Sequence, residues 1–388
     1  MKVLYLCHTI NSHHGGRTHA REFYAALNAV KGVESVDSFY ELEEGLPKPQ
    51  PSEKRLTAAS WLPPSIHAFL RMTVMHPRRT EEVSRKLAAQ NYDLLIVRNE
   101  SVRIDFAELK RRHPTVKIAI EVNAILSDEH FKSKMVRTLP RRLEFKQFRF
   151  VDKIFPVSSV LKQLLIDAGV SEDKIVVNPN GVDVRRFDCD LLSQRKALRR
   201  RYGIPEDRFV IGYLGGMEAF RRLPELVKSY ALLANGNQQD KFFLFVIGDG
   251  QDFPVVHAEL GRNCPKDSYL QLGWQDHQDV PQIMATFDLA VMPYTLDYCS
   301  PLKLFEYMSM GLPTIGPDTP SVRELFRAGE HLWLAPQNVV GSDGLAKLIR
   351  RLADDSAHRD GVAKKGCHWV KENYTWHTNA ARVISEFQ

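Results

Sequence analysis

The fold is decided by residues 300–313, which read SPLKLFEYMSMGLP. A proline suits the first turn of a helix, where its missing N–H is not needed, and a serine before it is a good N-cap. Gly311 and Pro313 then end the helix. We therefore expect a helix of about three turns that starts at Pro301 and is capped by Ser300.

The two sides of this helix differ, because successive residues point about 100° apart. Lys303 and Glu306 share one side with Tyr307 and Met310, whereas the other side is apolar. A helix N-terminus with a lysine favours an anion, and a carboxylate one turn further on accepts hydrogen bonds from neighbouring hydroxyls. The pair therefore suits a diphosphate joined to a ribose. A core helix with a solvent-facing Lys/Glu pair explains the stretch equally well.

Composition and charge narrow the class of protein. The chain has 388 residues, of which 44% are apolar and 26% charged, as expected for a folded protein of about two domains. The net charge of +6 is too mild to indicate a nucleic-acid partner. The five cysteines are scattered and form no Cys-x-x-Cys pair, which favours reduced thiols in the cytoplasm and no zinc site. No apolar run is long enough for a signal peptide or a membrane span.

Strand and helix patterns alternate twice along the chain. The first series opens with a buried strand at residues 3–7, the pair Gly15-Gly16 and then a helix. The second opens with a strand at residues 209–214, the pair Gly215-Gly216 and another helix. This alternation predicts an α/β protein with two doubly wound, Rossmann-like domains. We place the N-terminal domain at 1–185, the C-terminal domain at 186–370 and a final helical segment at 371–388.

Polar side chains end two strands of the first series. Arg98 closes one strand, and Glu121 and Asn123 close the next. Ligands of open parallel sheets bind at the carboxyl ends of the strands, so these residues are candidates for chemistry, with ordinary loop polarity as the alternative. A further strand that starts at residue 174 runs into the sequence NPNG, which predicts a tight turn out of the sheet.

Residues 132–149 are strongly basic, with seven lysines and arginines against the single acid Glu144. Apolar residues such as Met135 and Leu139 are interleaved with them. Contact with an anionic membrane surface or an anionic acceptor is one interpretation, and a solvated basic helix is the other.

Five motifs, in this order, resemble the retaining nucleotide-sugar glycosyltransferases of the GT-B fold, in particular glycosyltransferase family 4. They are NPNGVD at 178–183, GDG at 248–250, GWQD at 273–276, the helix at 300–313 and Glu324. The resemblance covers nearly the whole chain. It implies an acceptor-binding and a donor-binding Rossmann-like domain that face each other across a cleft, with the final segment crossing back to the first domain.

The resemblance also implies roles for individual residues. Lys303 and the N–H groups of its helix would hold the donor diphosphate, with Arg221 and Arg222 beside it, and Glu306 would bind the ribose. Gly16 would bring backbone N–H groups close to the phosphates and the acceptor. The implied set of substrate-binding residues is Gly15, Gly16, His19, Asn123, Gly215, Gly248, Gly250, Trp274, Ser300, Pro301, Leu302 and Glu306.

Three positions depart from the family pattern. Tyr298 stands where the family has the first of two glutamates eight positions apart, the second of which matches Glu306. Gly216 replaces an arginine on the diphosphate, so Arg221 or Arg222 would do more. Arg98 replaces a histidine near the reacting carbon. A guanidinium cannot act as a base at neutral pH, so Arg98 is expected to bind a sugar hydroxyl or a phosphate.

The sequence thus favours transfer of a sugar from a UDP- or GDP-linked donor to an acceptor hydroxyl, with retention of anomeric configuration. We expect no resident cofactor and no metal, because the sequence Asp188-Cys189-Asp190 lies between the domains and not in a suitable loop. The expected acceptor is a carbohydrate, a lipid-linked molecule or a small molecule. The expected location is the cytoplasm or the inner face of the membrane, with membrane contact through residues 132–149. The alternatives are a nucleotide-sugar epimerase, a phosphorylase, or a non-catalytic protein that binds membranes or anions.

Overall fold

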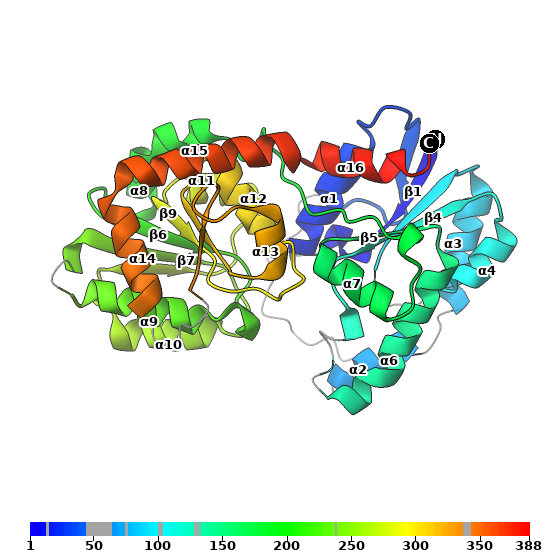
Figure 1. Cartoon of the computed structure of the whole chain (residues 1–388), viewed down its shortest axis with the longest axis horizontal. Coiled ribbons are helices and arrows are strands. Elements are labelled where there is room, and N and C mark those ends of the chain that lie inside the picture. Colours follow the sequence, from blue (N-terminus) through cyan, green and yellow to red (C-terminus); the bar gives the residue numbers. More distant parts are fainter. Residues whose placement is uncertain are drawn as a thin grey trace. The chain divides into compact units, whose positions relative to one another are not determined.

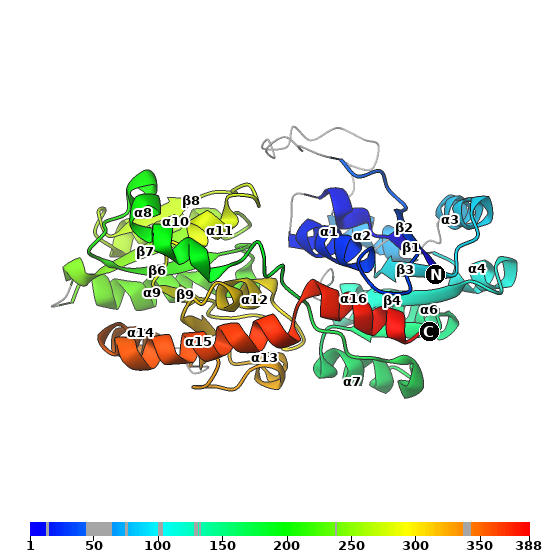
Figure 2. The ribbon, with the colours of Figure 1, turned by 90° about the horizontal axis from the view of Figure 1, so that it is seen from above.

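The computed structural model describes residues 1–12, 15–43, 64–73, 77–99, 104–127, 131, 133–236, 239–336 and 343–388. Within these ranges the chain forms two units. The N-terminal unit comprises Met1–Pro179 and His377–Gln388, and the C-terminal unit comprises Asn180–Trp376. Each unit contains a parallel sheet with helices packed around it (Figure 1, Figure 2). The predicted pair of Rossmann-like α/β domains is therefore confirmed.

The N-terminal sheet has the strand order β2-β1-β3-β4-β5, and its described ladders are parallel. The ladder between β3 and β4 places Arg98 opposite Glu121 at the carboxyl ends of the two strands. The strands of this sheet are β1 (Lys2–Leu6), β2 (Ser35–Ser38), β3 (Leu94–Arg98), β4 (Lys117–Val122) and β5 (Lys153–Pro156). The α-helices of this unit are α1 (Gly15–Leu27), α2 (Pro64–Thr73), α3 (Pro77–Ala89), α4 (Phe106–Arg112), α6 (Lys134–Gln147), α7 (Ser159–Asp167) and α16 (Trp376–Ser385).

The C-terminal sheet has the order β11-β10-β9-β6-β7-β8 and is also parallel in its described ladders. Its strands are β6 (Phe209–Leu214), β7 (Phe242–Ile247), β8 (Tyr269–Leu272), β9 (Leu289–Val291), β10 (Thr314–Gly316) and β11 (Trp333–Leu334). The α-helices are α8 (Arg195–Tyr202), α9 (Leu223–Ala234), α10 (Phe253–Asn263), α11 (Val280–Met284), α12 (Leu302–Ser309), α13 (Pro320–Leu325), α14 (Asp343–Asp354) and α15 (Ser356–Asn373). None of the helices that the structure describes is both long and apolar enough to cross a membrane.

Strand β7 shows why the C-terminal unit folds as two layers of helices on one sheet. Its sequence, FFLFVI, is apolar throughout, and every residue of it is buried. Such a run suits a parallel strand that is covered on both faces. Phe245 packs with Phe287 in the core cluster on one face, whereas Leu244 belongs to a second core cluster, which also contains Tyr230.

The boundaries between the two units lie a few residues from the expected positions in the sequence. We expected changes of domain after residues 185 and 370, whereas the structure divides the chain after Pro179 and after Trp376. The reason is a parallel bridge between Val182 and Thr375, in which Val182 N–H also donates to Tyr374 O (2.9 Å). This bridge holds both segments in the C-terminal unit.

The strand expected from residue 174 does not form. Ile175 makes a single bridge to Ile154, and Asn178 N–H donates to Pro156 O (2.8 Å). The next residue, Pro179, has no N–H to continue the ladder.

Two glycines allow the ends of β6 and β7 to come together. Gly248 has a φ of 138°, and a Cβ added to it would lie 1.9 Å from Gly215 O. Gly250 has a φ of 150°, and its Cβ would lie 2.8 Å from the backbone of Met217. Both positions require glycine because of backbone conformation and close approach, independently of any ligand.

The substitution Gly248→Ala tests this packing. The new methyl group would overlap Gly215 O in a conformation that L-residues rarely adopt, so the free energy of unfolding should fall by about 3 kcal/mol or more. The matched control is Gly261→Ala on the exposed face of α10, where an added Cβ meets nothing within 4 Å. That variant should gain about 0.5–1 kcal/mol from helix propensity. Equal melting temperatures for the two variants would contradict the packing argument.

Candidate active site

Helix α12 begins one residue later than expected. Pro301 is its N-cap, with φ −74° and ψ 117°. The prediction that Ser300 caps the helix is wrong, because Ser300 Oγ accepts a hydrogen bond from Asn180 N–H instead (3.1 Å). The Asn180 side-chain amide also donates to Ser300 O (2.6 Å). The NPNG turn therefore holds the segment that leads into α12.

The charged pair on α12 is buried. Glu306 is 2% exposed, the Lys303 side chain is 19% exposed, and Tyr307 and Met310 are fully buried. The interpretation of a solvent-facing Lys/Glu pair is therefore wrong. The Tyr307 hydroxyl donates to Leu214 O (3.0 Å) and accepts from Leu214 N–H (2.8 Å), which fixes α12 against the end of β6.

Three titratable groups lie close together at the start of α12, two of them on the helix and the third in the loop before α11. Lys303 Nζ donates to Glu306 Oε2, and His277 Nε2 lies 4.0 Å from Glu306 Oε1. Burial would raise the pKa of Glu306, but Lys303 and His277 together hold that pKa below its usual value. Burial lowers the pKa of His277, whose Nε2 is buried without a hydrogen-bond partner among the described residues. The two lowered pKa values favour a charged Glu306 and a neutral His277 at neutral pH.

The two arginines near the start of α9 are held in different ways. Arg221 Nη1 donates to Thr295 Oγ1 (2.9 Å). The Arg222 guanidinium lies over the ring of Tyr294, 4.3 Å from its centroid. Arg222 also has a φ of 53°, the one positive φ of a non-glycine residue in the described ranges. A left-handed backbone conformation costs energy at a non-glycine residue, and residues in such conformations are found most often at functional sites.

Gly216 does not leave an empty place for the family's arginine. A Cβ at Gly216 would lie 2.5 Å from a carboxylate oxygen of Glu218, whose other oxygen is 3.8 Å from Arg221 Nε. An acid therefore stands beside Arg221 at this turn. Trp274, after β8, and Tyr298, between β9 and α12, are both half-buried.

A second group of polar side chains lies in the N-terminal unit. His19 Nε2 and Glu121 Oε1 are 3.0 Å apart, and the Tyr5 hydroxyl donates to Glu121 Oε2 (3.1 Å). All three residues are buried. Burial raises the pKa of Tyr5 well above its ordinary value, so the phenol keeps its proton as a donor. The sequence placed Glu121 at a strand end and His19 near the glycine pair, and the structure joins them.

Arg98 is fixed from two sides. Its Nη1 donates to Gly16 O (3.1 Å), and its Nη2 and Nε donate to the side-chain oxygen of Asn123 (2.7 and 3.2 Å). Gly15 and Gly16 form the first turn of α1, and a Cβ on Gly16 would meet the side chain of Thr9 at 3.1 Å. The structure thus brings the predicted residues Arg98, Gly16 and Asn123 together.

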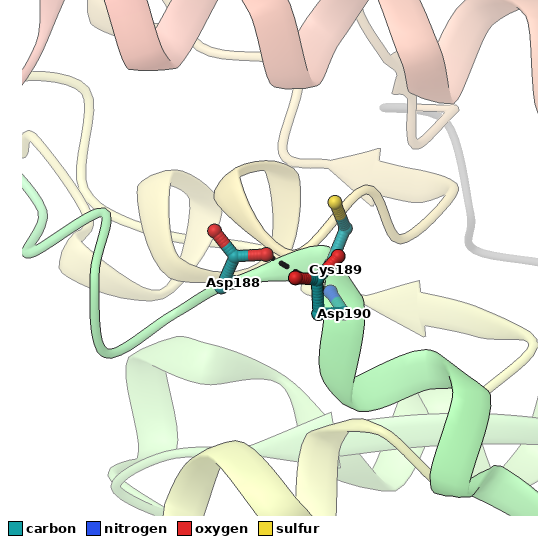
Figure 3. Close-up of side chains that lie close together, drawn as sticks. All are labelled: Asp188, Cys189 and Asp190. Atoms are coloured by element: carbon teal, nitrogen blue, oxygen red, sulfur yellow. Dashed lines mark hydrogen bonds between the residues drawn. The ribbon is translucent and has the colours of Figure 1, made fainter.

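Three atoms that could bind a metal ion lie within 4.8 Å of one another (Figure 3). They come from the side chains of Asp188, Cys189 and Asp190. The geometry has a local explanation, because Asp188 caps the short helix at Cys189–Gln194 by accepting from Asp190 N–H (2.9 Å). Asp188 also pairs with Lys371 (3.3 Å). The capping bond, with Lys371, lowers the pKa of Asp188. The carboxylate is therefore already engaged in a capping role.

Two contributors to the site were missed in the sequence. His277 follows the GWQD motif and precedes α11, and a lone histidine in a loop carries no signal of its partner. Thr295 accepts a hydrogen bond from Arg221, but nothing in the sequence around Thr295 indicates this contact. Both reach the site through contacts with residues distant along the chain.

Family models match both halves of the chain. The model described as "Glycosyltransferase Family 4" matches residues 14–186, and "Glycosyl transferases group 1" matches residues 194–369. The chain belongs to the family 4 type of glycosyltransferase. Its helix α12, the Arg221–Arg222 pair and both glycine turns of the C-terminal unit lie inside the second match.

Curated relatives are similar over part of their length. The 2-deoxystreptamine glucosyltransferase of Streptomyces kanamyceticus is 24% identical over 237 residues, which are 58% of this chain and 57% of the relative. The chain spans about half the length of the curated relatives it matches.

Solved structures show the same fold over the whole chain. HepE of Anabaena in complex with UDP has a TM-score of 0.72 and 18% identity, with 100% of this chain and 99% of that chain covered. The sucrose-phosphate synthase of Thermosynechococcus elongatus has a TM-score of 0.74 and 15% identity, with 100% and 98% covered. This glycosyltransferase therefore has the GT-B fold, as the motifs predicted.

The substitution Lys303→Ala tests whether the Lys303 side chain is needed for turnover. If Lys303 contacts the leaving diphosphate, as the motif implies, turnover measured as release of nucleoside diphosphate should fall by at least ~10²-fold in this variant. The matched control is Lys347→Ala, which removes an exposed helical lysine paired with Asp343 four residues away. It should leave turnover unchanged. Near-wild-type turnover in Lys303→Ala would refute the role.

The lowered pKa of His277 has a consequence for stability. Between the ordinary histidine pKa, about 6.5, and the lower folded value, the unfolded chain binds a proton that the folded chain does not. The free energy of unfolding therefore falls as the pH drops through this window. In His277→Gln we expect a smaller loss of melting temperature from about pH 7.5 to about pH 5.5 than in the wild type. The control is His257→Gln on the exposed face of α10, and an identical loss in His277→Gln and wild type would contradict the burial effect.

Proposed function

We propose that this glycosyltransferase moves a sugar from a UDP- or GDP-linked donor to an acceptor hydroxyl, with retention of anomeric configuration and without a metal. The observation that carries the proposal is the buried Lys303–Glu306 pair at the start of α12. The match of the surrounding unit to the group 1 model supports it, as does the UDP bound by the structurally similar HepE.

Lys303 and Glu306 divide the recognition of the donor between them. A lysine ammonium has three N–H donors, all of which can serve a diphosphate once Lys303 has turned away from Glu306. The carboxylate in turn retains acceptor capacity for two ribose hydroxyls. The low dielectric around a buried pair makes each of these contacts stronger than at the surface.

Donor binding would begin with an exchange of partners. Lys303 Nζ donates to Glu306 Oε2 in this structure, so this oxygen can accept from a ribose hydroxyl only after the ammonium turns towards the phosphates. The diphosphate supplies the negative charge that draws Lys303 away. His277, 4.0 Å from Glu306, then remains beside the carboxylate as it receives the ribose.

The leaving diphosphate gains negative charge as the glycosidic bond breaks, and stabilising that charge is an electrostatic task. Lys303, Arg221 and Arg222 supply three cations for it, in the place that a metal ion has in other transferases. Retention then follows if the donor phosphate itself takes the proton of the acceptor hydroxyl on the face from which it leaves.

The N-terminal unit would bind the acceptor. Arg98 is always charged and is held by Gly16 and Asn123, so it suits a hydroxyl or phosphate of the acceptor as a fixed donor. His19 is oriented by Glu121, which is itself held by Tyr5. The acceptor would be a carbohydrate, a lipid-linked molecule or a small molecule.

The nucleotide is identified first. Thermal-shift measurements with UDP, GDP, ADP and dTDP should show stabilisation by UDP or GDP, because binding to the folded state alone raises the melting temperature. EDTA should leave the shift and the turnover unchanged. Stabilisation by ADP or dTDP alone would overturn the proposed donor class, and loss of turnover in EDTA would overturn metal independence.

The products then test the reaction. With the preferred donor and an acceptor, the anomeric proton coupling of the product should match that of the donor. An inverted coupling would refute retention. A new sugar epimer formed without acceptor would indicate an epimerase instead, and consumption of inorganic phosphate would indicate a phosphorylase.

A further inference from the structure

Two helices of the N-terminal unit, α2 and α6, are neighbours (Figure 1). Both carry apolar side chains on their exposed surface. Met135 is 87% exposed, and Leu139, one turn further along α6, is 49% exposed. On α2, Ile66 and Leu70 have the same spacing and are 45% and 43% exposed. Of the nine large hydrophobic side chains exposed in the described ranges, six lie on α2, on α6 or in the turn directly after α6. Contiguous exposed apolar patches mark interaction sites, which makes this part of the N-terminal unit a candidate for one.

Basic side chains flank this surface. A pocket of about 620 Å³ runs along α6 and is lined by Arg137, Arg141, Arg142, Lys146 and Arg149 together with Phe145. The Arg141 guanidinium lies over the Phe145 ring, 5.4 Å from its centroid. Of the basic residues counted in this segment, Lys132 lies outside the described residues. The pocket has the charge and size for phosphate-bearing headgroups.

The one acid of α6 points inward and does not offset this charge. Glu144 is 3% exposed and accepts hydrogen bonds from the Asn99 side chain (3.0 Å), Leu126 N–H (2.9 Å) and Ser127 N–H (3.1 Å). The helix is therefore anchored by its buried face, and its outward face carries only basic, polar and apolar residues. Asn99 directly follows Arg98, so the same contact ties α6 to the strand end that carries the proposed acceptor arginine.

We propose that the α2–α6 surface, formed by Ile66, Leu70, Met135, Val136 and Leu139 with the basic residues of α6, docks onto an anionic lipid bilayer. The apolar side chains would enter the boundary between headgroups and acyl chains, and the arginines and Lys146 would contact lipid phosphates. This arrangement is that of an interfacial helix pair, which combines an apolar stripe with flanking positive charge. A helix that merely faces solvent would explain the basic residues. It would not explain why the apolar side chains of Met135 and Leu139 are exposed to water. A soluble polyanion would explain the arginines but not the apolar stripe.

The test is co-sedimentation of the full chain with vesicles of phosphatidylglycerol and phosphatidylcholine, and with vesicles of phosphatidylcholine alone. We expect binding to the anionic vesicles only, weakened by added salt. The double variants Met135→Gln/Leu139→Gln and Arg141→Gln/Arg142→Gln should each weaken binding by about tenfold or more, since each removes part of the apolar or electrostatic attraction.

Matched controls come from the C-terminal unit. Leu232→Gln/Val255→Gln removes two apolar side chains that are 46% and 47% exposed, and Arg185→Gln/Arg327→Gln removes two exposed arginines. Both controls should bind like the wild type. All variants alter exposed or half-exposed side chains, and unchanged melting curves establish that they fold.

Several outcomes would overturn the proposal. One is no binding to anionic vesicles. Another is wild-type binding by Met135→Gln/Leu139→Gln, or displacement by glycerol phosphate in solution, either of which would indicate an anion site without membrane insertion. A concentration-dependent dimer in sedimentation velocity, abolished by Met135→Gln/Leu139→Gln, would assign the surface to a second copy of the chain.

Discussion

The position of helix α12 in the C-terminal unit depends on one hydroxyl group. Tyr307 bonds both backbone groups of Leu214, the last residue of β6, and so fixes the depth and rotation of α12 against the sheet. Burial raises the pKa of Tyr307 well above its ordinary value, so the hydroxyl keeps the proton that it donates. Because Glu306 precedes Tyr307 and Lys303 lies one turn before, their positions follow from this contact. The glycine turn after Leu214 is held at the same point.

Burial then gives these charges their strength. A carboxylate removed from water costs several kcal/mol unless a cation and hydrogen bonds compensate it. Glu306 has the cation in Lys303 and a nearby imidazole in His277. The N-terminal unit also buries a glutamate, but there Glu121 is held by the His19 imidazole and the Tyr5 hydroxyl. Each unit thus contains a buried acidic side chain, Glu306 on α12 and Glu121 near the end of β4, whose orientation is set by its neighbours.

The parts of this picture that the sequence predicts are those encoded locally. Buried parallel strands are continuous apolar runs, so both sheets were expected. The spacing of Lys303 and Glu306 on one short helix likewise indicated a pair that suits a diphosphate joined to a ribose. The missed features join residues far apart in the chain, such as Ser300 with Asn180 and Glu306 with His277. Packing decides such pairs, and no local pattern encodes them. The left-handed backbone of Arg222 was equally invisible, because an arginine does not signal it.

The order in which the units can be completed during synthesis follows from the last segment. Residues 377–388 belong to the N-terminal unit, where Asn379 donates to Pro179 O (2.5 Å) and Arg382 donates to Asn178 Oδ1 (3.0 Å). Ala380, Val383 and Ile384 are buried there. A ribosome makes these residues only after the whole of 180–376, so the N-terminal unit cannot be completed until the C-terminal unit has been synthesised. Until α16 has been made, the part of the N-terminal unit that is synthesised first lacks the helix that carries these buried apolar side chains.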